Sequence, residues 1–230
     1  MSVFSPAENL KEIQNRIVKA CESCGRSSND VTLIAVSKTK PIDLISEVKD
    51  AGQLHFGENK VQELQEKMPE LGEDVIWHMI GTLQTNKIKY LVERVDWIHS
   101  IPKIKALKEL EKRASKVGRT IKTLIQVNIS NEDQKSGCDP EELEALLKYA
   151  QDLKHVRVEG LMGIATFIDD LDVVRSEFRL LREIRDQHQH MNSENINLKH
   201  LSMGMTNDLE VAIEEGSTMV RVGTAIFGSR

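Results

Sequence analysis

Short apolar runs alternate with longer amphipathic stretches along this chain of 230 residues. Apolar runs of this length are typical of buried strands. They cover residues 31–37, 53–57, 75–81, 97–101, 120–129, 156–165, 199–204 and 218–223. Between and before them, apolar residues recur at spacings of three and four, which predicts helices. These helices cover residues 7–24, 42–51, 60–66, 84–94, 104–116, 140–152, 171–191 and 208–215.

This order of elements predicts an α/β fold. Strands that alternate with helices form parallel sheets with right-handed crossovers. Eight strand–helix units predict a closed (β/α)8 TIM barrel, with an extra helix at 7–24 before the first strand. An open, doubly wound sheet is the alternative, but no G-x-G-x-x-G follows the first strand. We therefore expect a single barrel domain over residues 1–230.

Composition narrows the class of function. A content of 40% hydrophobic and 29% charged residues fits a globular protein with a real core. A net charge of −5 and 4% aromatic residues disfavour nucleic-acid binding, which uses basic faces and stacking platforms. No apolar run approaches the roughly 20 residues that span a bilayer, and the polar N-terminus lacks the apolar core of a signal peptide. We expect a cytoplasmic protein without membrane contact.

The cysteines give no sign of a disulfide framework or a metal site. There are three, and Cys21 and Cys24 form one C-x-x-C in the last turn of the first helix. The helix dipole there has the wrong sign to favour a thiolate. No second C-x-x-C completes a zinc site, so we expect no metal and place both cysteines on the buried side of the helix.

Candidate chemistry lies where the strands end. In barrels of this kind, reactive groups gather at the C-terminal strand ends, and phosphate often binds after strands seven and eight. The segments "LSMGMTNDLE" and "RVGTAIFG" each follow a strand with a glycine turn and a helix start, which suits an anion. Ser202, Thr206, Gly223 and Thr224 are the candidate phosphate ligands. A capping box with Asn207 as N-cap and Glu210 is a compatible interpretation of the first segment.

Lys38 ends the first strand, in "VTLIAVSKTKP", and faces the same mouth. It is a candidate point charge, general base or Schiff-base nucleophile, and desolvation by the strand would lower its pKa. The alternative is a solvated loop lysine, which is what we expect of Lys40. Together with a phosphate cradle, Lys38 indicates a phosphorylated carbonyl compound, either pyridoxal 5′-phosphate (PLP) or a sugar-phosphate aldolase substrate.

Two further polar residues near strand ends leave both interpretations open. His78 lies inside the third strand, where a histidine is more often a satisfied core residue than a functional one. Asn59, in "FGENKVQE", either caps the following helix or reaches a ligand.

Several motifs together resemble the YggS/PROSC family of pyridoxal-phosphate homeostasis proteins, from residue 31 to residue 230. They are "AVSKTKP", "HFGENKVQE", "WHMIGTLQTNK", "IHSI", "LSMGMTNDLEVAI" and "RVGTAIFGSR". Members of this family resemble the N-terminal barrel domain of alanine racemase without that enzyme's second, β-rich domain. The family often has an aromatic residue at Lys60, a proline at Thr82 and a serine at Thr206. Thr206 keeps the hydroxyl group, so its expected role is unchanged.

The resemblance implies a role for each matching residue. Lys38 would form a Schiff base with the PLP aldehyde, and Arg221 would face the pyridine nitrogen. The phosphate would be bound by Ser202, Thr206, Gly223 and Thr224, while Asn59 and His78 complete the expected cofactor-binding set. Because an arginine stays protonated, it would keep the ring nitrogen unprotonated and the ring a weak electron sink.

The function that we expect is to hold PLP reversibly and to buffer or deliver it, without robust catalysis. Apo-enzymes that need PLP are the potential partners, and we expect a monomer. The alternatives are a weak PLP-dependent amino-acid racemase, a Schiff-base aldolase and a regulatory module with a protein partner. A racemase needs acid–base groups on both faces of the substrate α-carbon, and the sequence offers one obvious lysine.

Overall fold

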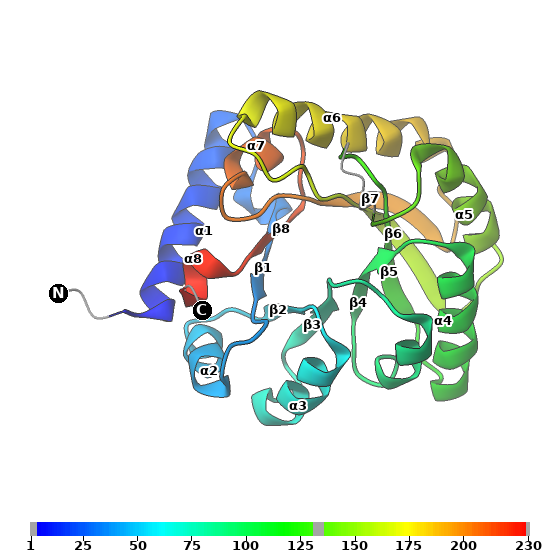
Figure 1. Cartoon of the computed structure of the whole chain (residues 1–230), viewed down its shortest axis with the longest axis horizontal. Coiled ribbons are helices and arrows are strands. Elements are labelled where there is room, and N and C mark those ends of the chain that lie inside the picture. Colours follow the sequence, from blue (N-terminus) through cyan, green and yellow to red (C-terminus); the bar gives the residue numbers. More distant parts are fainter. Residues whose placement is uncertain (1–3, 131–135, 229–230) are drawn as a thin grey trace.

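Eight parallel strands close into a barrel in the computed structural model, which describes residues 4–130 and 136–228. Each strand pairs with its neighbours in the sequence, and β8 pairs with β1 to complete the ring (Figure 1). The strands are β1 (Thr32–Val36), β2 (His55–Glu58), β3 (Ile76–Met79), β4 (Trp97–Ile101), β5 (Ile121–Gln126), β6 (Val156–Met162), β7 (Ile196–Ser202) and β8 (Met219–Val222). The predicted TIM barrel is confirmed, and the pairing of β1 with β8 rules out the open sheet.

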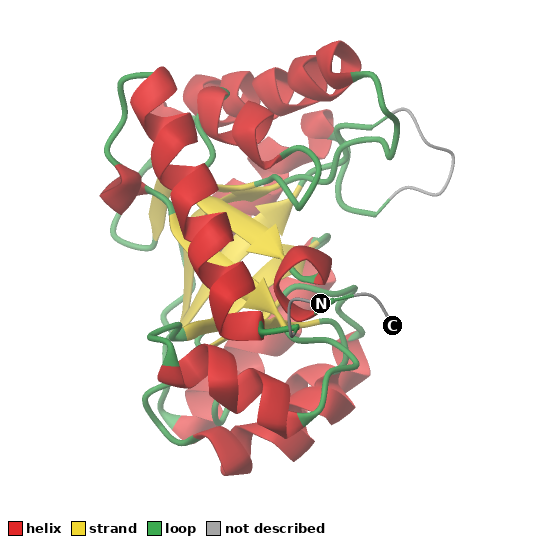
Figure 2. Cartoon of the chain, turned by 90° about the vertical axis from the view of Figure 1, so that its left-hand side faces the viewer, coloured by secondary structure: helices red, strands yellow, loops and turns green. Residues whose placement is uncertain are grey.

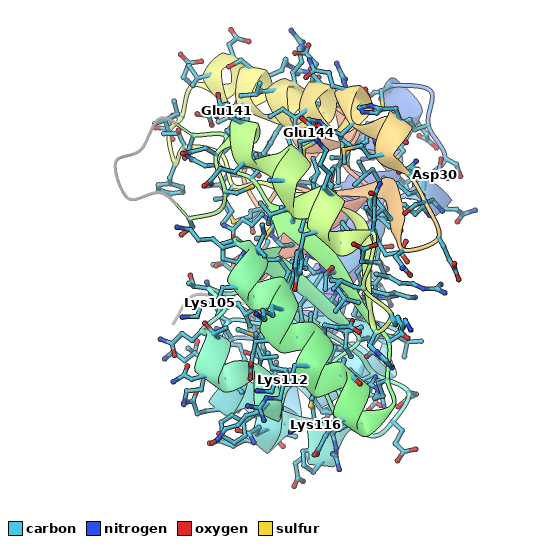
Figure 3. All side chains as sticks on the ribbon, turned by 90° about the vertical axis from the view of Figure 1, so that its right-hand side faces the viewer. Asp30, Lys105, Lys112, Lys116, Glu141 and Glu144 are labelled. Carbon is cyan, nitrogen blue, oxygen red and sulfur yellow. The ribbon has the colours of Figure 1, made fainter. Side chains whose placement is uncertain are left out.

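Helices surround the strands, as the apolar periodicity predicts. They are α1 (Pro6–Ser23), α2 (Ile42–Asp50), α3 (Val61–Leu71), α4 (Ile104–Val117), α5 (Leu143–Ala150), α6 (Leu171–Gln187), α7 (Leu209–Glu214) and α8 (Thr224–Phe227). The described part of the chain also has short 3-10 helices, namely η1 (Ser28–Asp30), η2 (Thr85–Tyr90), η3 (Pro140–Glu142) and η4 (Gln189–Met191). Charged residues occupy the outer faces of α4 and α5, where Figure 3 labels Lys105, Lys112, Lys116 and Glu144.

The segment between β3 and β4 differs from its prediction. Instead of one helix over 84–94, the structure has the 3-10 helix η2 followed by turns. Thr85 and Asn86 are poor interior helix residues because their side chains compete for nearby backbone groups. The apolar side chains are nevertheless buried, among them Ile88, Leu91 and Val95. The four-residue helix α8 is absent from the prediction because it is too short to show a period.

Helix α1 covers the seam between the first and last strands. It packs against α7 and α8, which are too short to cover the barrel there by themselves. Figure 2 shows α1 lying across the outside of the strands on this side. Its buried stripe includes Leu10, Ile13, Ile17 and Cys21, as predicted. The extra N-terminal helix is therefore part of the outer layer of the barrel.

The barrel has two buried regions. The larger core lies between strands and helices, and a small apolar cluster of Ile34, Trp97, Leu124, Met162 and Met219 is separate from it. Buried polar strand residues add His78, His99, Thr123, Ser202 and Arg221. Over the described residues, no helix is both long enough and apolar enough to cross a membrane.

Candidate functional site

A cavity of about 250 Å³ opens beside the C-terminal ends of the strands. It brings together residues that follow β1, β2 and β7 with the end of β8. Six of the eight predicted site residues line it: Lys38, Asn59, Thr206, Arg221, Gly223 and Thr224. They converge because the C-terminal ends of parallel barrel strands meet at one rim.

Lys38 stands in a tight turn directly after β1. The Ser37 N–H donates to the Gly57 carbonyl at 3.0 Å, which continues the pairing of β1 with β2. Thr39 has a φ of +63°, a conformation that costs free energy for a residue with a Cβ. Its N–H donates to Glu63 Oε2 at 2.6 Å. Lys38 itself is exposed, so the expected desolvation by the strand is not found.

A buried ion cluster holds both sides of this turn. Lys67 from α3 is 6% exposed, and its Nζ donates to the Ser37 carbonyl at 2.8 Å. The same Nζ donates to Glu58 at 2.6 Å and to Glu63 at 2.9 Å, which uses all three ammonium protons. Burial raises the pKa of Glu58, although the hydrogen bonds from Lys67 and Ser37 act to lower it. We call Glu58, Glu63 and Lys67 the turn cluster.

Glycines allow the close backbone packing found after β7 and β8, next to the cavity. A Cβ on Gly223 would lie 3.1 Å from the Val36 carbonyl oxygen and 3.2 Å from the Val36 Cβ. Gly204 has a φ of +94°, and a Cβ there would lie 2.5 Å from that of Ala212. The chain can therefore turn sharply after β7 and pack closely after β8, while Thr206 and Thr224 line the cavity.

The turn after β7 is fastened by α1 and not by the predicted capping box. Helix α7 begins after Asp208, whose carboxylate accepts a bond from the Met205 N–H. Arg16 donates to the Thr206 carbonyl at 2.8 Å and binds both oxygens of Glu210, at 2.7 and 2.9 Å. Glu210 is thus engaged by an arginine from another helix, and its pKa is lowered by that bond.

Arg221 lies under the cavity and is 5% exposed. Its guanidinium donates to Ser202 Oγ at 2.6 Å and to the Gly163 carbonyl at 3.0 Å. Burial lowers the pKa of Arg221 to about 10, which still leaves it protonated at neutral pH. The Arg221 guanidinium therefore places a fixed positive charge at the cavity.

The other two predicted site residues, Ser202 and His78, do not line the cavity. Ser202 is fully buried, and its hydroxyl contacts Arg221 and His99. His78 is also fully buried, between His55 and His99, and burial holds its pKa well below the ordinary range. Ser202 is hydrogen-bonded to Arg221 directly and His78 is connected to it through His99 and Ser202, and a direct contact with a cofactor stays a prediction for both.

Several residues that line the cavity were not predicted from the sequence. Lys40 is half-buried and lines the cavity, and its Nζ donates to the Gly228 carbonyl at 2.8 Å. The expectation of a solvated loop lysine was therefore wrong. No local signal could have found this contact, because its partner lies 188 positions away. The apolar lining residues Val36, Ile80, Met162, Ile164 and Met205 come from the C-terminal ends of β1, β3, β6 and β7 or the loops that follow them.

The arrangement suits a small anion that carries a carbonyl group. Among the described residues that line the cavity, the charged ones are the cations Lys38, Lys40 and Arg221. Three threonine hydroxyl groups, those of Thr39, Thr206 and Thr224, and a glycine turn offer hydrogen-bond donors and room for an anionic group. An accessible lysine amine on the same cavity is a nucleophile for a carbonyl carbon.

Comparison with known proteins agrees with this geometry. The family described as "Alanine racemase, N-terminal domain" matches residues 9–230. A curated relative from Aquifex aeolicus (strain VF5), named "Pyridoxal phosphate homeostasis protein", is 46% identical over 228 residues and covers 99% of each chain. A solved structure of an unknown protein from Bifidobacterium adolescentis has a TM-score of 0.92 at 36% identity, covering 96% of this chain and 94% of its own.

A second solved structure is described with PLP bound. It is PipY of Synechococcus elongatus PCC7942, which is 37% identical with a TM-score of 0.81 and covers 92% of this chain and 100% of its own. The matches extend over nearly the whole length of this chain and of these relatives. This chain therefore belongs to the alanine racemase N-terminal domain family and, within it, to the pyridoxal phosphate homeostasis proteins.

Proposed function

We propose that this protein binds PLP in the cavity at the barrel mouth, as a Schiff base on Lys38, and takes part in PLP homeostasis. The observation that carries the proposal is an accessible lysine amine that shares one small cavity with Thr206, Gly223 and Thr224. The names of the relatives and the PLP-bound PipY structure support the same ligand.

The residues present fit this cofactor. Gly223 leaves space that a Cβ would fill against Val36, so a phosphate group can approach the backbone closely. Thr206 and Thr224 offer hydroxyl donors, and Arg221 offers a fixed positive charge. Lys38 is exposed and its turn is held by the turn cluster, so its amine reaches the cavity without a rearrangement of β1.

The proposed role is to hold and release the cofactor rather than to catalyse a reaction with it. Bound PLP supplies a reactive aldehyde and an electron-withdrawing ring. Arg221 only donates, so a ring nitrogen that meets it accepts that bond and stays unprotonated, which weakens the ring as an electron sink. Among the described lining residues, the titratable groups are Lys38, Lys40 and Arg221, and none is a tyrosine, a histidine or a carboxyl group.

Reduction with borohydride tests the proposed attachment. Purified protein mixed with PLP should develop an imine absorbance band, because the amine condenses with the aldehyde and releases water. Borohydride should reduce the imine and fix the cofactor to the peptide that contains Lys38. Lys38→Ala and Lys38→Arg should both fold and lose the band, and the arginine variant separates loss of the amine from loss of the charge.

The matched control is Lys105→Ala, an exposed lysine of α4 on the outer surface (Figure 3). This variant should keep the band and the modified Lys38 peptide. Protein that takes up no PLP, or covalent cofactor that persists in Lys38→Ala, would contradict the proposal. Amino-acid racemisation at ordinary enzymatic rates would favour the racemase alternative.

Delivery is the finer part of the proposal. We propose that apo-enzymes that need PLP receive it from this protein, in the cytoplasm and from a monomer. Loaded protein mixed with such an apo-enzyme should restore its activity faster than the release of PLP into buffer allows. Equal rates would limit the role to buffering, and light scattering of the loaded protein tests the monomer.

A further inference from the structure

A continuous series of hydrogen bonds crosses the interior of the barrel. His55 Nδ1 lies 3.0 Å from His78 Nε2, and His78 Nδ1 lies 2.8 Å from His99 Nε2. His99 Nδ1 lies 2.9 Å from Ser202 Oγ, which accepts the 2.6 Å bond from Arg221. We call these five residues the interior network.

The network joins the two ends of the barrel. His55 is the first residue of β2 and is half-buried, whereas Arg221 contacts the cavity at the other end. His78, His99 and Ser202 are fully buried between them, on β3, β4 and β7. Trp97 stacks on His78, with ring centroids 5.9 Å apart and planes inclined by 10°. The apolar surroundings make any unpaired polar atom in this series costly.

Arg221 can set the direction of every bond in the network. A guanidinium only donates, so Ser202 Oγ must accept from it. The single hydroxyl proton of Ser202 is then donated to His99 Nδ1, which lies 2.9 Å away. A neutral imidazole has one N–H and one lone pair, so His99 donates from Nε2 to His78, and His78 donates from Nε2 to His55.

The opposite direction leaves a group unsatisfied. If His99 donated to Ser202, the serine oxygen would accept two hydrogen bonds. The serine hydroxyl proton would then lose His99 Nδ1 as its acceptor inside a fully buried site. The forward direction also turns a lone pair of each neutral group towards Arg221. This matters because the hydrogen bonds from this buried guanidinium to Ser202 and to Gly163 both go to neutral oxygens.

We infer that the interior network runs in one direction, from Arg221 to His55, with all three rings protonated on Nε2, and that it seats the Arg221 guanidinium at the cavity. Ser202 is thus the positioning residue for Arg221, His99 and His78 fix the direction of its hydroxyl group, and His55 is the terminal acceptor of the network. The inference does not rest on the proposed function, because it concerns groups within the protein alone.

Protonation of His55, at the end of the network far from the cavity, would reverse the direction of its hydrogen bonds. A protonated His55 would donate from both ring nitrogens, so His78 and His99 would each have to move their proton from Nε2 to Nδ1. Burial lowers the pKa of His55 and so opposes this protonation. The charge of Asp96 raises that pKa, and the charge of Lys122 lowers it. Lys122 also faces His78, while Arg221 and His200 face His99 and disfavour charge there. One proton at His55 therefore changes three rings together.

Nitrogen-15 NMR of histidine-labelled, cofactor-free protein tests the direction. At neutral pH, His55, His78 and His99 should each show a protonated Nε2 and an unprotonated Nδ1. On acidification, while circular dichroism shows that the fold persists, all three rings should change with one shared midpoint. A protonated Nδ1 on His78 or His99 at neutral pH, or three separate midpoints, would overturn the inference.

Two variants at opposite ends of the interior network test whether Arg221 sets the direction of its hydrogen bonds. Ser202→Ala removes the link to Arg221, so His99 should show mixed tautomers and the Arg221 N–H protons should exchange about tenfold faster. His55→Ala removes only the terminal acceptor, so His99 and Arg221 should keep their wild-type signals. Ser202→Thr keeps the hydroxyl group, so His99 and Arg221 should show their wild-type signals in this variant as well.

Equal effects of Ser202→Ala and His55→Ala would show that Arg221 does not set the direction. If Ser202→Ala does not fold, the wild-type tautomers and their shared midpoint decide the inference without it.

Discussion

At the scale of single residues, Lys38 and Gly223 illustrate how far a local pattern reaches. A lysine that ends an apolar run and a glycine that ends another are both visible in the sequence, and both line the cavity. Lys40 has the same residue type and the same loop as Lys38, yet its partner is the carbonyl of Gly228. Its role could not be predicted because that contact depends on how the chain closes.

Gly223→Ala should weaken the binding of PLP by about tenfold, or about 1.4 kcal/mol. The added Cβ would press on Val36 at 3.1 to 3.2 Å, so the turn must shift by a few tenths of an ångström into the space for the anion. Titration followed by absorbance measures the affinity. The φ of −118° is open to alanine, so the urea unfolding midpoint should barely move. Unchanged affinity would show that this turn does not bind the phosphate.

At the scale of secondary-structure elements, α3 holds the end of β1. The turn cluster connects Lys67 and Glu63 of α3 with Glu58 of β2, and it binds the backbone on both sides of Lys38. The helix itself follows from its apolar period. Its functional contact does not, because a lysine on an amphipathic helix is ordinarily solvated.

Lys67→Met should lower the free energy of unfolding by about 3–5 kcal/mol, because two carboxylates lose their shared buried partner. Urea unfolding measures the loss. Lys108→Met is the matched control on α4, where the lysine is exposed, and should change stability by about 0.5 kcal/mol or less. A similar loss in both variants would mean that the turn cluster adds little.

Glu58→Gln should change the pH dependence of stability. Burial raises the pKa of Glu58, so the folded protein keeps a proton there that the unfolded chain loses above about pH 4.3. Its contribution to stability therefore falls as pH rises from that value to the folded pKa. Wild type should lose stability relative to Glu58→Gln as the pH rises above about 4.3, as measured by urea unfolding. A constant difference between the two proteins would contradict this assignment.

At the scale of the whole molecule, closure of the barrel depends on contacts between the two ends of the chain. β1 pairs with β8, and Arg16 of α1 fastens the turn after β7. Between them, Gly160 of β6 has a φ of +152° at a shift in register with β7. A Cβ there would lie 1.9 Å from the His200 carbonyl oxygen, so the backbones of β6 and β7 are in direct contact.

Gly160→Ala should prevent formation of the closed barrel, because the clash is with backbone that cannot move without breaking the sheet. Circular dichroism and urea unfolding should show loss of the cooperative native transition. Gly118→Ala is the comparison, since Gly118 has a φ of +65° with nothing within 4 Å of its Cβ position. It should cost about 1 kcal/mol from backbone strain alone. A native-like transition in Gly160→Ala would show that the strands can separate there.

The sequence by itself determined the barrel, its order of strands and helices, and the six residues that line the cavity from predicted positions. Periodicity carries the order of strands and helices because burial of one face is a local property of each element, whereas the roles expected of Asn59 and Arg221 came from the family resemblance. Only the tertiary structure decided the turn cluster, the contact of Arg16 with Thr206, and the interior network. His99 and Ser202 lie 103 positions apart, and their bond exists because β4 and β7 face each other across a closed barrel.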